Sequence, residues 1–394
     1  MKILLIAKTL HPPWGTGYVS YIRGFLKSLF RLGNLEVHLL STMRSREYLK
    51  QVIEHDVLFE YFREFKDFLG SIHRAIYLEE HIKNRTVSRR ALIKLFGRFN
   101  NEIGFDYIHD FAGLDLAILK HAVKHGKISR LFRHIMTPAI KHRWRAYSYI
   151  AKLLAKTRFF TYVFSSSKVA KSYGFSSSYI VIPPAIDTNI YKPLNIEKPN
   201  DEYDHHLLYI GPLNPDRFPP QIIKALKLIQ DSMRARVKLL AISAPWRRKI
   251  ELKYVRTLRA LAKNYGVDKN FKINFKTLTE NEKVTLIKQC DAFIYLPNPV
   301  SQKVIVPVDP PITPLEVMAC GKPVVSTPYY SLKDILEECT KEAIVKSLEA
   351  RDIADKVIKA LEHKQAGFCF REYVNNRFSI DAVSKLLLHM YRMA

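Results

Sequence analysis

Short apolar runs alternate with amphipathic stretches along most of the chain, and this alternation limits the possible folds more than any other feature. The run KILLIA (2–7) has the length and composition of a strand that is buried on both faces. After the loop HPPWGTG, the stretch YVSYIRGFLKSLFRLG (18–33) has apolar residues at helical spacing and ends at Gly33. Strands that alternate with such helices form parallel sheets with crossover helices. The sequence therefore predicts an α/β fold.

The alternation runs twice, and a stretch of different composition separates the two halves. Residues 187–206 are rich in Pro, Asn and Asp and poor in apolar side chains, which is typical of a linker, and we place the boundary near 190–204. At 394 residues, the chain is also too long for one core. The sequence predicts a first domain over 1–190, a second domain over 204–375, and a C-terminal helix over 376–394 that packs back on the first domain.

The remaining elements are predicted from the same two periodicities. In the first half, strands are expected within 35–41, 105–111, 158–166 and 178–186. In the second half, strands are expected within 206–211, 237–243, 270–275, 291–297 and 322–327, and helices within 220–230, 250–266, 279–290, 313–321, 351–363 and 379–393. Residues 47–98 are charged, aromatic and helical in period, and the order of their elements stays open.

The chain is strongly basic, with 63 Lys and Arg against 37 Asp and Glu and a formal net charge of +26. Residues 117–186 contain no acidic residue at all. Such a surface is either a solvated basic face or a docking surface for an anionic membrane leaflet. Nucleic acid would also suit the charge, but the sequence holds no DNA- or RNA-recognition motif, so no nucleic-acid partner is expected.

The stretch HRWRAYSYIAKLLAKTRFF (142–160) combines apolar residues at helical spacing with Arg and Lys between them. Basic, aromatic amphipathic helices lie on membrane interfaces, although the same spacing equally suits a helix that packs in a core. In the first alternative, an acceptor or membrane surface includes Arg143, Trp144, Arg145 and Lys152. Because no apolar run approaches the ~18 residues of a membrane helix, membrane contact would be peripheral.

The cysteines and the start of the chain both indicate a cytoplasmic protein. The four cysteines lack the spacing of metal ligands, which predicts reduced thiols and no metal site. The apolar run at the start is short, lacks a small-residue cleavage site and meets HPPWGTG directly, so we interpret it as a buried strand rather than a signal peptide. The inner face of the membrane is the candidate place of any peripheral attachment.

Four strings follow one another along the chain and carry a resemblance to a known family. They are FSSSKVAKSYGFSSSYIVIPPAIDTNIYKP (164–193), YIGPLNPDRFPPQIIKAL (209–226), LTENEKVTLIKQCDAFIYLP (278–297) and ITPLEVMACGKPVVST (312–327). In order and spacing they resemble the family-4 glycosyltransferases, also called glycosyl transferases group 1. The resemblance implies the GT-B architecture, in which two doubly wound Rossmann-like domains face a central cleft. The first domain would bind the acceptor and the second the nucleotide sugar.

The last of these strings contains the strongest candidate for donor binding. Glu316 follows Thr313, Pro314 and Leu315 in the first turn of a predicted helix. Unpaired amides at a helix start suit a diphosphate, and a carboxylate beside them can accept two hydrogen bonds from a ribose diol. The family assigns that role to the matching Glu. The alternative is a Glu that only stabilises the helix dipole.

Two further donor-binding candidates come from the resemblance. Arg217 lies where the family has a Lys that clamps the diphosphate, and its guanidinium can bind phosphate with two donors, unless it is only a solvated loop residue. Pro212 replaces the second cation of that motif. Gly15 and Gly17 match a glycine-rich loop that approaches the donor phosphate or the acceptor.

The candidate catalytic residues lie where the chain departs from the family. Val308 occupies the position of a Glu that contacts the transferred sugar, so either the next residue, Asp309, replaces it or the acid is lost. His109 matches the first of two alternating His at a strand end, and Phe111 replaces the second. For His109, a packed polar residue is the alternative to a catalytic one.

Together these features predict a glycosyltransferase that moves a sugar from a nucleotide-diphosphate sugar to an acceptor. The resemblance implies retention of the anomeric configuration and no metal or cofactor beyond the donor substrate. From the charge, we expect a lipid-phosphate or membrane-surface glycan as acceptor. The departures at Val308, Pro212 and Phe111 leave a second hypothesis open, a catalytically inactive binding protein with the same fold. Nucleic-acid binding is a third, weaker alternative.

Overall fold

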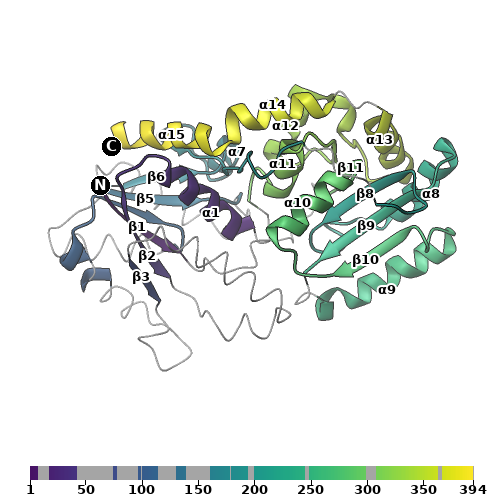
Figure 1. Cartoon of the computed structure of the whole chain (residues 1–394), viewed down its shortest axis with the longest axis horizontal. Coiled ribbons are helices and arrows are strands. Elements are labelled where there is room, and N and C mark those ends of the chain that lie inside the picture. Colours follow the sequence, from purple (N-terminus) through teal and green to yellow (C-terminus); the bar gives the residue numbers. More distant parts are fainter. Residues whose placement is uncertain are drawn as a thin grey trace. The chain divides into compact units, whose positions relative to one another are not determined.

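The computed structural model divides the chain into two compact units (Figure 1). The structure describes residues 1–7, 17–41, 74–77, 96–98, 100–113, 130–138, 160–177, 179–193, 199–244, 248–298, 308–362 and 366–393. Unit 1 comprises Met1–Ala185, Pro307–Asp309 and Val383–Ala394, and unit 2 comprises Ile186–Val306 and Pro310–Ala382. The chain therefore passes from unit 2 into unit 1 and back again directly before the predicted donor helix.

Unit 1 is built on a parallel sheet of seven strands in the order β3-β2-β1-β4-β5-β6-β7. The strands are β1 (Lys2–Ala7), β2 (Glu36–Ser41), β3 (Arg74–Tyr77), β4 (Tyr107–Asp110), β5 (Arg130–Ile135), β6 (Phe160–Phe164) and β7 (Ile180–Val181). Two of them, β3 and β5, do not correspond to any strand predicted from the sequence. The strand order reverses between the neighbours β1 and β4, which is the topological switch point of this sheet.

The helices α1 (Gly17–Phe30) and α15 (Ile380–Met393) pack in unit 1. The Tyr21 hydroxyl in α1 donates to the carbonyl of Ile182 at 2.6 Å, directly after β7. The Ser384 hydroxyl in α15 donates to the carbonyl of Ser28 in α1 at 2.8 Å, so the two helices are linked through the backbone of α1. A third helix, α7 (Ser167–Ser172), follows β6 and contributes to a separate apolar cluster with the sheet.

Unit 2 is built on a parallel sheet of five strands in the order β10-β9-β8-β11-β12. The strands are β8 (His205–Ile210), β9 (Val237–Ser243), β10 (Phe271–Phe275), β11 (Ala292–Tyr295) and β12 (Val324–Ser326), and each lies within or close to a predicted strand. The chain adds β9 and β10 on one side of β8 and then β11 and β12 on the other. The switch point therefore lies between β8 and β11.

The helices of unit 2 cover both faces of this sheet (Figure 1). They are α8 (Gln221–Met233), α9 (Arg248–Asn264), α10 (Glu280–Gln289), α11 (Ile312–Ala319), α12 (Tyr330–Cys339), α13 (Ala350–Glu362) and α14 (Ala366–Phe378). One apolar core joins α8, α9 and α13 to the sheet. The helices α10 and α11 contact β8, β11 and β12, and α14 packs on α11. As predicted, Thr279 caps α10, with a reciprocal hydrogen bond from the cap backbone to Glu282.

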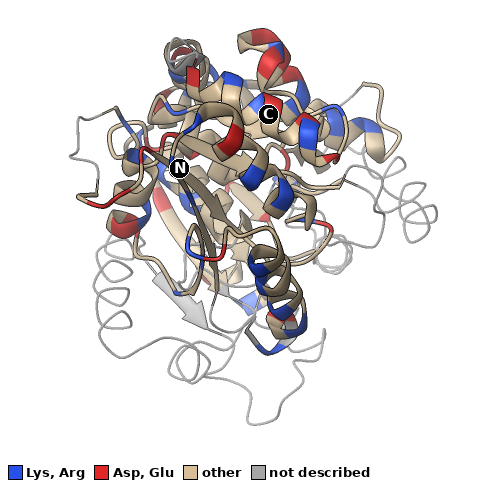
Figure 2. Cartoon of the chain, turned by 90° about the vertical axis from the view of Figure 1, so that its right-hand side faces the viewer, with Lys and Arg blue, Asp and Glu red and all other residues tan. Residues whose placement is uncertain are grey.

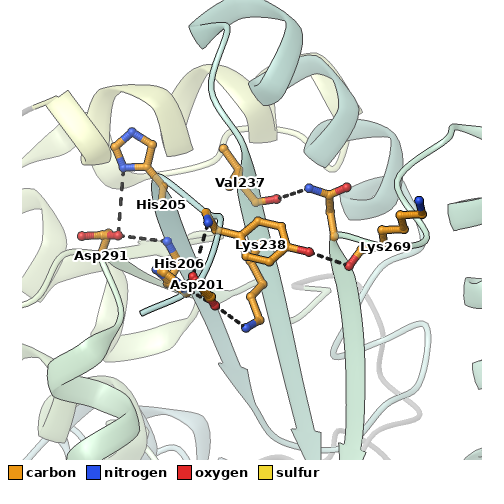
Figure 3. A network of polar contacts seen from close by, with 9 residues as sticks. Asp201, His205, His206, Val237, Lys238, Lys269 and Asp291 are labelled. Atoms are coloured by element: carbon orange, nitrogen blue, oxygen red, sulfur yellow. Dashed lines mark hydrogen bonds and ion pairs between the residues drawn. The ribbon is translucent and has the colours of Figure 1, made fainter. Parts of the chain in front are cut away.

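A polar network holds the segment before β8 at the amino ends of the strands of unit 2 (Figure 3). Asp201 accepts hydrogen bonds from His206 Nε2 at 3.0 Å and from Lys238 Nζ at 2.8 Å. Burial acts to raise the pKa of Asp201, but these hydrogen bonds outweigh it and hold the pKa at about 2. This network lies at the end of the strands opposite to the carboxyl ends, where α/β sheets bind ligands.

Lys and Arg residues are spread over the helices of the described chain (Figure 2). The helix α9 is one example, and its exposed residues include Lys249, Lys253, Arg256, Arg259 and Lys263. Among the described residues, no helix has both the length and the apolar character needed to cross a bilayer. The four cysteines are free thiols, of which Cys290 and Cys320 are buried.

Candidate functional site

The loops at the carboxyl ends of β8 and β11 bring two of the predicted donor-binding elements to the switch point of unit 2. The loop after β8 carries Arg217, and the chain after β11 leads to α11, which carries Glu316. The carboxyl ends of neighbouring strands on either side of a switch point leave a crevice that the connecting helices do not fill. This is the candidate site, and its residues are described in turn.

Arg217 is held at the end of β11 by the fold of its own loop. Its Nη1 donates to the Tyr295 hydroxyl at 3.3 Å, and Tyr295 is the last residue of β11. The amide of Asn298 donates to the carbonyl of Asp216 at 2.8 Å, which joins the two loops through their backbones. Only 8% of Arg217 is exposed, so its guanidinium is preorganised at the switch point rather than free in solvent.

The helix α11 begins at Ile312, one residue earlier than predicted, and its first turn lacks a side-chain cap. The N-cap position is Pro311, which makes no side-chain hydrogen bond to the helix. Pro314 has no amide proton, and the amide of Leu315 donates to the carbonyl of Pro311 at 3.4 Å. The amides of Ile312 and Thr313 thus form the open end of the helix. Thr313 is half-buried at this end, whereas Leu315 is part of the packed interior of the unit.

Because α11 begins earlier than predicted, Glu316 is its fifth residue and lies just past the first turn, where it is almost completely buried. Its Oε2 forms an ion pair with Lys283 Nζ from α10, and the Tyr191 hydroxyl donates a hydrogen bond to the same carboxylate. Burial raises the pKa of Glu316 above its ordinary value, and Lys283 and Tyr191 counteract part of that effect. The carboxylate is therefore buried, oriented and paired with a cation, which is more than stabilisation of a helix dipole requires.

Arg371 from α14 binds the backbone of the two segments that hold this carboxylate and its donor Tyr191. Its Nη1 donates to the carbonyl of Tyr191 at 2.9 Å and to the carbonyl of Ala319 at the end of α11, and its Nη2 donates to the carbonyl of Thr188 at 3.4 Å. A cation at a helix C-terminus stabilises the helix dipole. Arg371 therefore fixes α11 and the Tyr191 loop together.

Two further predicted residues belong to the elements beside the switch point of unit 1, Gly17 in α1 after β1 and His109 in β4. Gly17 is the first residue of α1, and a Cβ added there would lie 3.2 Å from Val308 Cγ2, so little room is left for a side chain. The Tyr18 hydroxyl donates to the carbonyl of Phe111 at 3.2 Å, which joins the start of α1 to the loop after β4. Gly15 lies outside the described residues.

His109 lies in the interior of unit 1, near the end of β4. Its Nδ1 shares a hydrogen bond with His134 Nε2 at 2.8 Å, and its Nε2 shares one with the Tyr391 hydroxyl of α15 at 2.7 Å. The rings of Phe25 and Phe132 lie against it, with centroids 4.9 and 5.0 Å away. Burial lowers the pKa of His109 to about 3. With no exposed surface and both nitrogens engaged, His109 suits a packing role better than proton transfer.

Asp309 is also fully buried in unit 1. Its Oδ2 accepts a hydrogen bond from Ser166 Oγ at 2.5 Å, its carbonyl accepts one from Ser165 Oγ at 2.5 Å, and its amide donates to the carbonyl of Met136 at 3.0 Å. Val308 is 4% exposed. The residues of the predicted acceptor or membrane surface, Arg143, Trp144, Arg145 and Lys152, lie outside the described residues.

Several residues of the candidate site were not singled out from the sequence. They are Lys283, Tyr191, Tyr295 and Arg371, which hold or pair with the predicted donor-binding residues. Tyr191 was recognised only as part of a family string. Lys283 stands four residues after the predicted cap Thr279. A lysine on the buried face of that predicted helix was the signal in the sequence that could have identified it.

Comparisons with known proteins bear on the family and the fold. Residues 194–376 match the family model described as "Glycosyl transferases group 1". No curated protein sequence matches the chain. Among solved structures, a glycosyltransferase from Rickettsia africae has a TM-score of 0.72 at 14% identity, covering 100% of this chain and 98% of its own. HepE from Anabaena in complex with UDP and glucose has a TM-score of 0.71 at 14% identity, covering 100% of both chains. The sucrose-phosphate synthase of Thermosynechococcus elongatus has a TM-score of 0.69 at 15% identity, covering 100% of this chain and 99% of its own. These full-length matches confirm the predicted GT-B fold.

Proposed function

We propose that this chain, which belongs to the glycosyl transferases group 1 family through residues 194–376, is a glycosyltransferase. It transfers a glycosyl group from a nucleotide-diphosphate sugar that is bound to unit 2. One observation carries the proposal. Arg217 lies in the loop after β8, and Glu316, with its buried carboxylate behind the open end of α11, lies in the helix after β11. The strands β8 and β11 are neighbours at the switch point of this sheet.

The donor nucleotide is bound in two places. The amides at the start of α11 and Arg217 bind the diphosphate, because both present donors to an anion and neither adds a competing negative charge. Glu316 accepts hydrogen bonds from the ribose diol. The structures of Anabaena HepE with UDP and glucose and with UDP-glucose support a nucleotide sugar as the class of donor. The base and the sugar stay open.

In the reaction, the bond between the sugar carbon and the donor phosphate oxygen breaks, and a bond from that carbon to an acceptor hydroxyl oxygen forms. The acceptor proton leaves to the departing diphosphate or to water. Arg217 and the α11 amides stabilise the charge that develops on the diphosphate. Val308 cannot hydrogen-bond to a sugar hydroxyl, and the carboxylate of Asp309 is bound by Ser166. We therefore assign Asp309 to fixing the loop before α11, and retention remains part of the proposal on the family resemblance alone.

The acceptor is proposed on charge. The formal net charge of +26, and the 70 residues of 117–186 without an acidic side chain, suit an acceptor that carries phosphate, such as a lipid-linked glycan at the cytoplasmic face of a membrane.

A panel of UDP-, GDP- and ADP-sugars tests the function directly. We expect the purified full-length chain to cleave one of them slowly to free sugar and nucleotide diphosphate, and to transfer the sugar when an acceptor lipid phosphate is added, with mass spectrometry of the products. Binding of a nucleotide sugar without cleavage or transfer would instead support the second hypothesis, an inactive binding protein, which the replacements at Val308, Pro212 and Phe111 favour.

A further inference from the structure

Lys283 is largely buried in unit 2, where it pairs with the carboxylate that we propose as the ribose acceptor. It is on the first half of α10, and its side chain is 11% exposed against 7% for Glu316. The ion pair joins two helices that the chain reaches from different strands, α10 after β10 and α11 after β11. A largely buried lysine ammonium needs a compensating charge, and Glu316 supplies it.

The pair leaves part of the carboxylate able to accept further hydrogen bonds. An ionised carboxylate has about four lone-pair positions on its two oxygens. The ammonium of Lys283 and the hydroxyl of Tyr191 are the donors that reach it from the described residues around it. Two positions are then left, which is the number that the two hydroxyls of a ribose diol require. Lys283 and the nucleotide can therefore bind the same carboxylate together.

The charge of Glu316 depends on Lys283 more than on any other neighbour. Glu280, on the same helix as Lys283, acts in the opposite sense and favours the neutral acid. Cys320 at the end of α11 is a neutral thiol whose pKa burial raises to about 12. Arg371 on α14 donates its hydrogen bonds to backbone carbonyls of α11 and the Tyr191 loop. Tyr191 contributes a neutral donor. Lys283 is thus the cation in direct contact with Glu316 among the described residues.

We propose that Lys283 is a positioning residue for nucleotide binding: its ammonium keeps Glu316 in the ionised, oriented form that accepts the ribose diol. This role rests on the proposed function of Glu316. Without the ammonium, the buried carboxyl takes up a proton at a higher pH. A protonated carboxyl turns one acceptor oxygen into a hydroxyl, so the nucleotide loses part of its hydrogen bonding. The pair therefore sets the lower pH limit of donor binding.

The test is the pH profile of nucleotide affinity, measured by titration calorimetry on the full-length chain. UDP, GDP and ADP are titrated first, and the tightest binder serves as the probe from pH 5.5 to 8.5. We expect Lys283→Met to lose affinity at a pH higher than the wild type does, with the midpoint moved up by about one unit. Lys283→Arg, which keeps the cation, is expected to restore most of the wild-type profile. The β-phosphate titrates alike in every variant, so the difference between variants is the readout.

Two variants control the interpretation. Lys288→Met makes the same substitution on the same helix at a buried lysine, 7% exposed, that does not pair with Glu316, and we expect its profile to match the wild type. Glu316→Gln cannot ionise at this position. We expect it to bind the nucleotide weakly, and its affinity should show no pH midpoint that differs between variants. If Lys283→Met does not fold, Lys283→Gln takes its place, with thermal unfolding at each pH as the check.

The two possible failures are distinguishable. A wild-type chain that binds none of the three nucleotides contradicts the proposed function itself. A wild-type chain that binds one of them, with Lys283→Met following the same pH profile, overturns the role of Lys283 and leaves the donor site in place.

Discussion

The hydroxyl of Ser166 connects the carboxylate of Asp309 to the first turn of α7. It donates to Asp309 Oδ2 at 2.5 Å and accepts from the amide of Val169 at 3.1 Å. A carboxylate near a helix N-terminus is further stabilised by the helix dipole. Pro310 and Pro311 follow Asp309 directly and lead into α11. Asp309, which was expected beside the transferred sugar, therefore fixes the chain before the donor helix.

Removing this connection should destabilise the chain and couple the two residues energetically. We expect Ser166→Ala to lower the free energy of unfolding by about 2–3 kcal/mol, because it removes both a helix cap and a hydrogen bond to a buried charged group. Urea unfolding of Ser166→Ala, Asp309→Ala and the double variant measures the coupling. Strictly additive effects would show that the two side chains do not interact in solution.

The hydrogen bond between His109 and Tyr391 provides a test of whether His109 has a packing role or a catalytic one. Tyr391→Phe removes the hydroxyl that shares a hydrogen bond with His109 Nε2 and leaves a buried nitrogen unpaired. We expect a loss of about 1–3 kcal/mol in the free energy of unfolding, while the turnover rate of the folded protein changes by less than about twofold. If turnover instead slowed by about 100-fold or more while folding stayed unchanged, His109 would belong to the reaction itself.

The two buried histidines should make stability depend on pH. Burial lowers the pKa of His109 from 6.5 to about 3 and that of His134 well below 6.5, so both stay neutral in the folded chain. Below pH 6.5 the unfolded chain takes up protons that the folded chain does not, so stability is lost as pH falls. The slope approaches about 1.4 kcal/mol per pH unit for each histidine at pH values well below 6.5.

Urea unfolding between pH 7 and 5.5 measures that slope. His109→Gln should reduce it by roughly half a proton at pH 6.5 and by close to one proton at pH 5.5. His389→Gln, at an exposed position of α15, is the matched control and should leave the slope unchanged. Equal slopes for His109→Gln and the wild type would contradict the buried, neutral state of His109.

The sequence predicted unit 2 better than unit 1, and the reason lies in the strands. In unit 2, β8 and β11 are short apolar runs between clear turn and cap signals, and the strand ends fixed the places of Arg217 and Glu316. In unit 1, β5 (RLFRHI) carries Arg130, Arg133 and His134, which conceal its strand character, and β3 is four residues within a stretch of helical period. β5 is a strand because the sheet pairs it with β4 and β6, and β3 because it pairs with β2 at the edge, and a local pattern does not contain these pairings.

The partners of the site residues were beyond local patterns for the same reason. His109 and Tyr391 are 282 residues apart in the chain, and Lys283 meets Glu316 only because two crossover helices pack side by side on one sheet. The motif identified Glu316 as a candidate but not the cation that balances it. Asp309 was predicted from its position beside the missing Glu, whereas its hydrogen bonds with Ser165 and Ser166 depend on β6 and α7.

The central claim is that a nucleotide binds unit 2 through the carboxylate of Glu316. Calorimetric titration of UDP, GDP and ADP into the wild type and Glu316→Ala, both checked for folding, tests it most directly. We predict that the wild type binds at least one nucleotide and that the variant loses affinity by tenfold or more, about 1.4 kcal/mol, because two hydrogen bonds to a charged acceptor disappear. A folded Glu316→Ala chain that binds the same nucleotide with wild-type affinity would contradict the account.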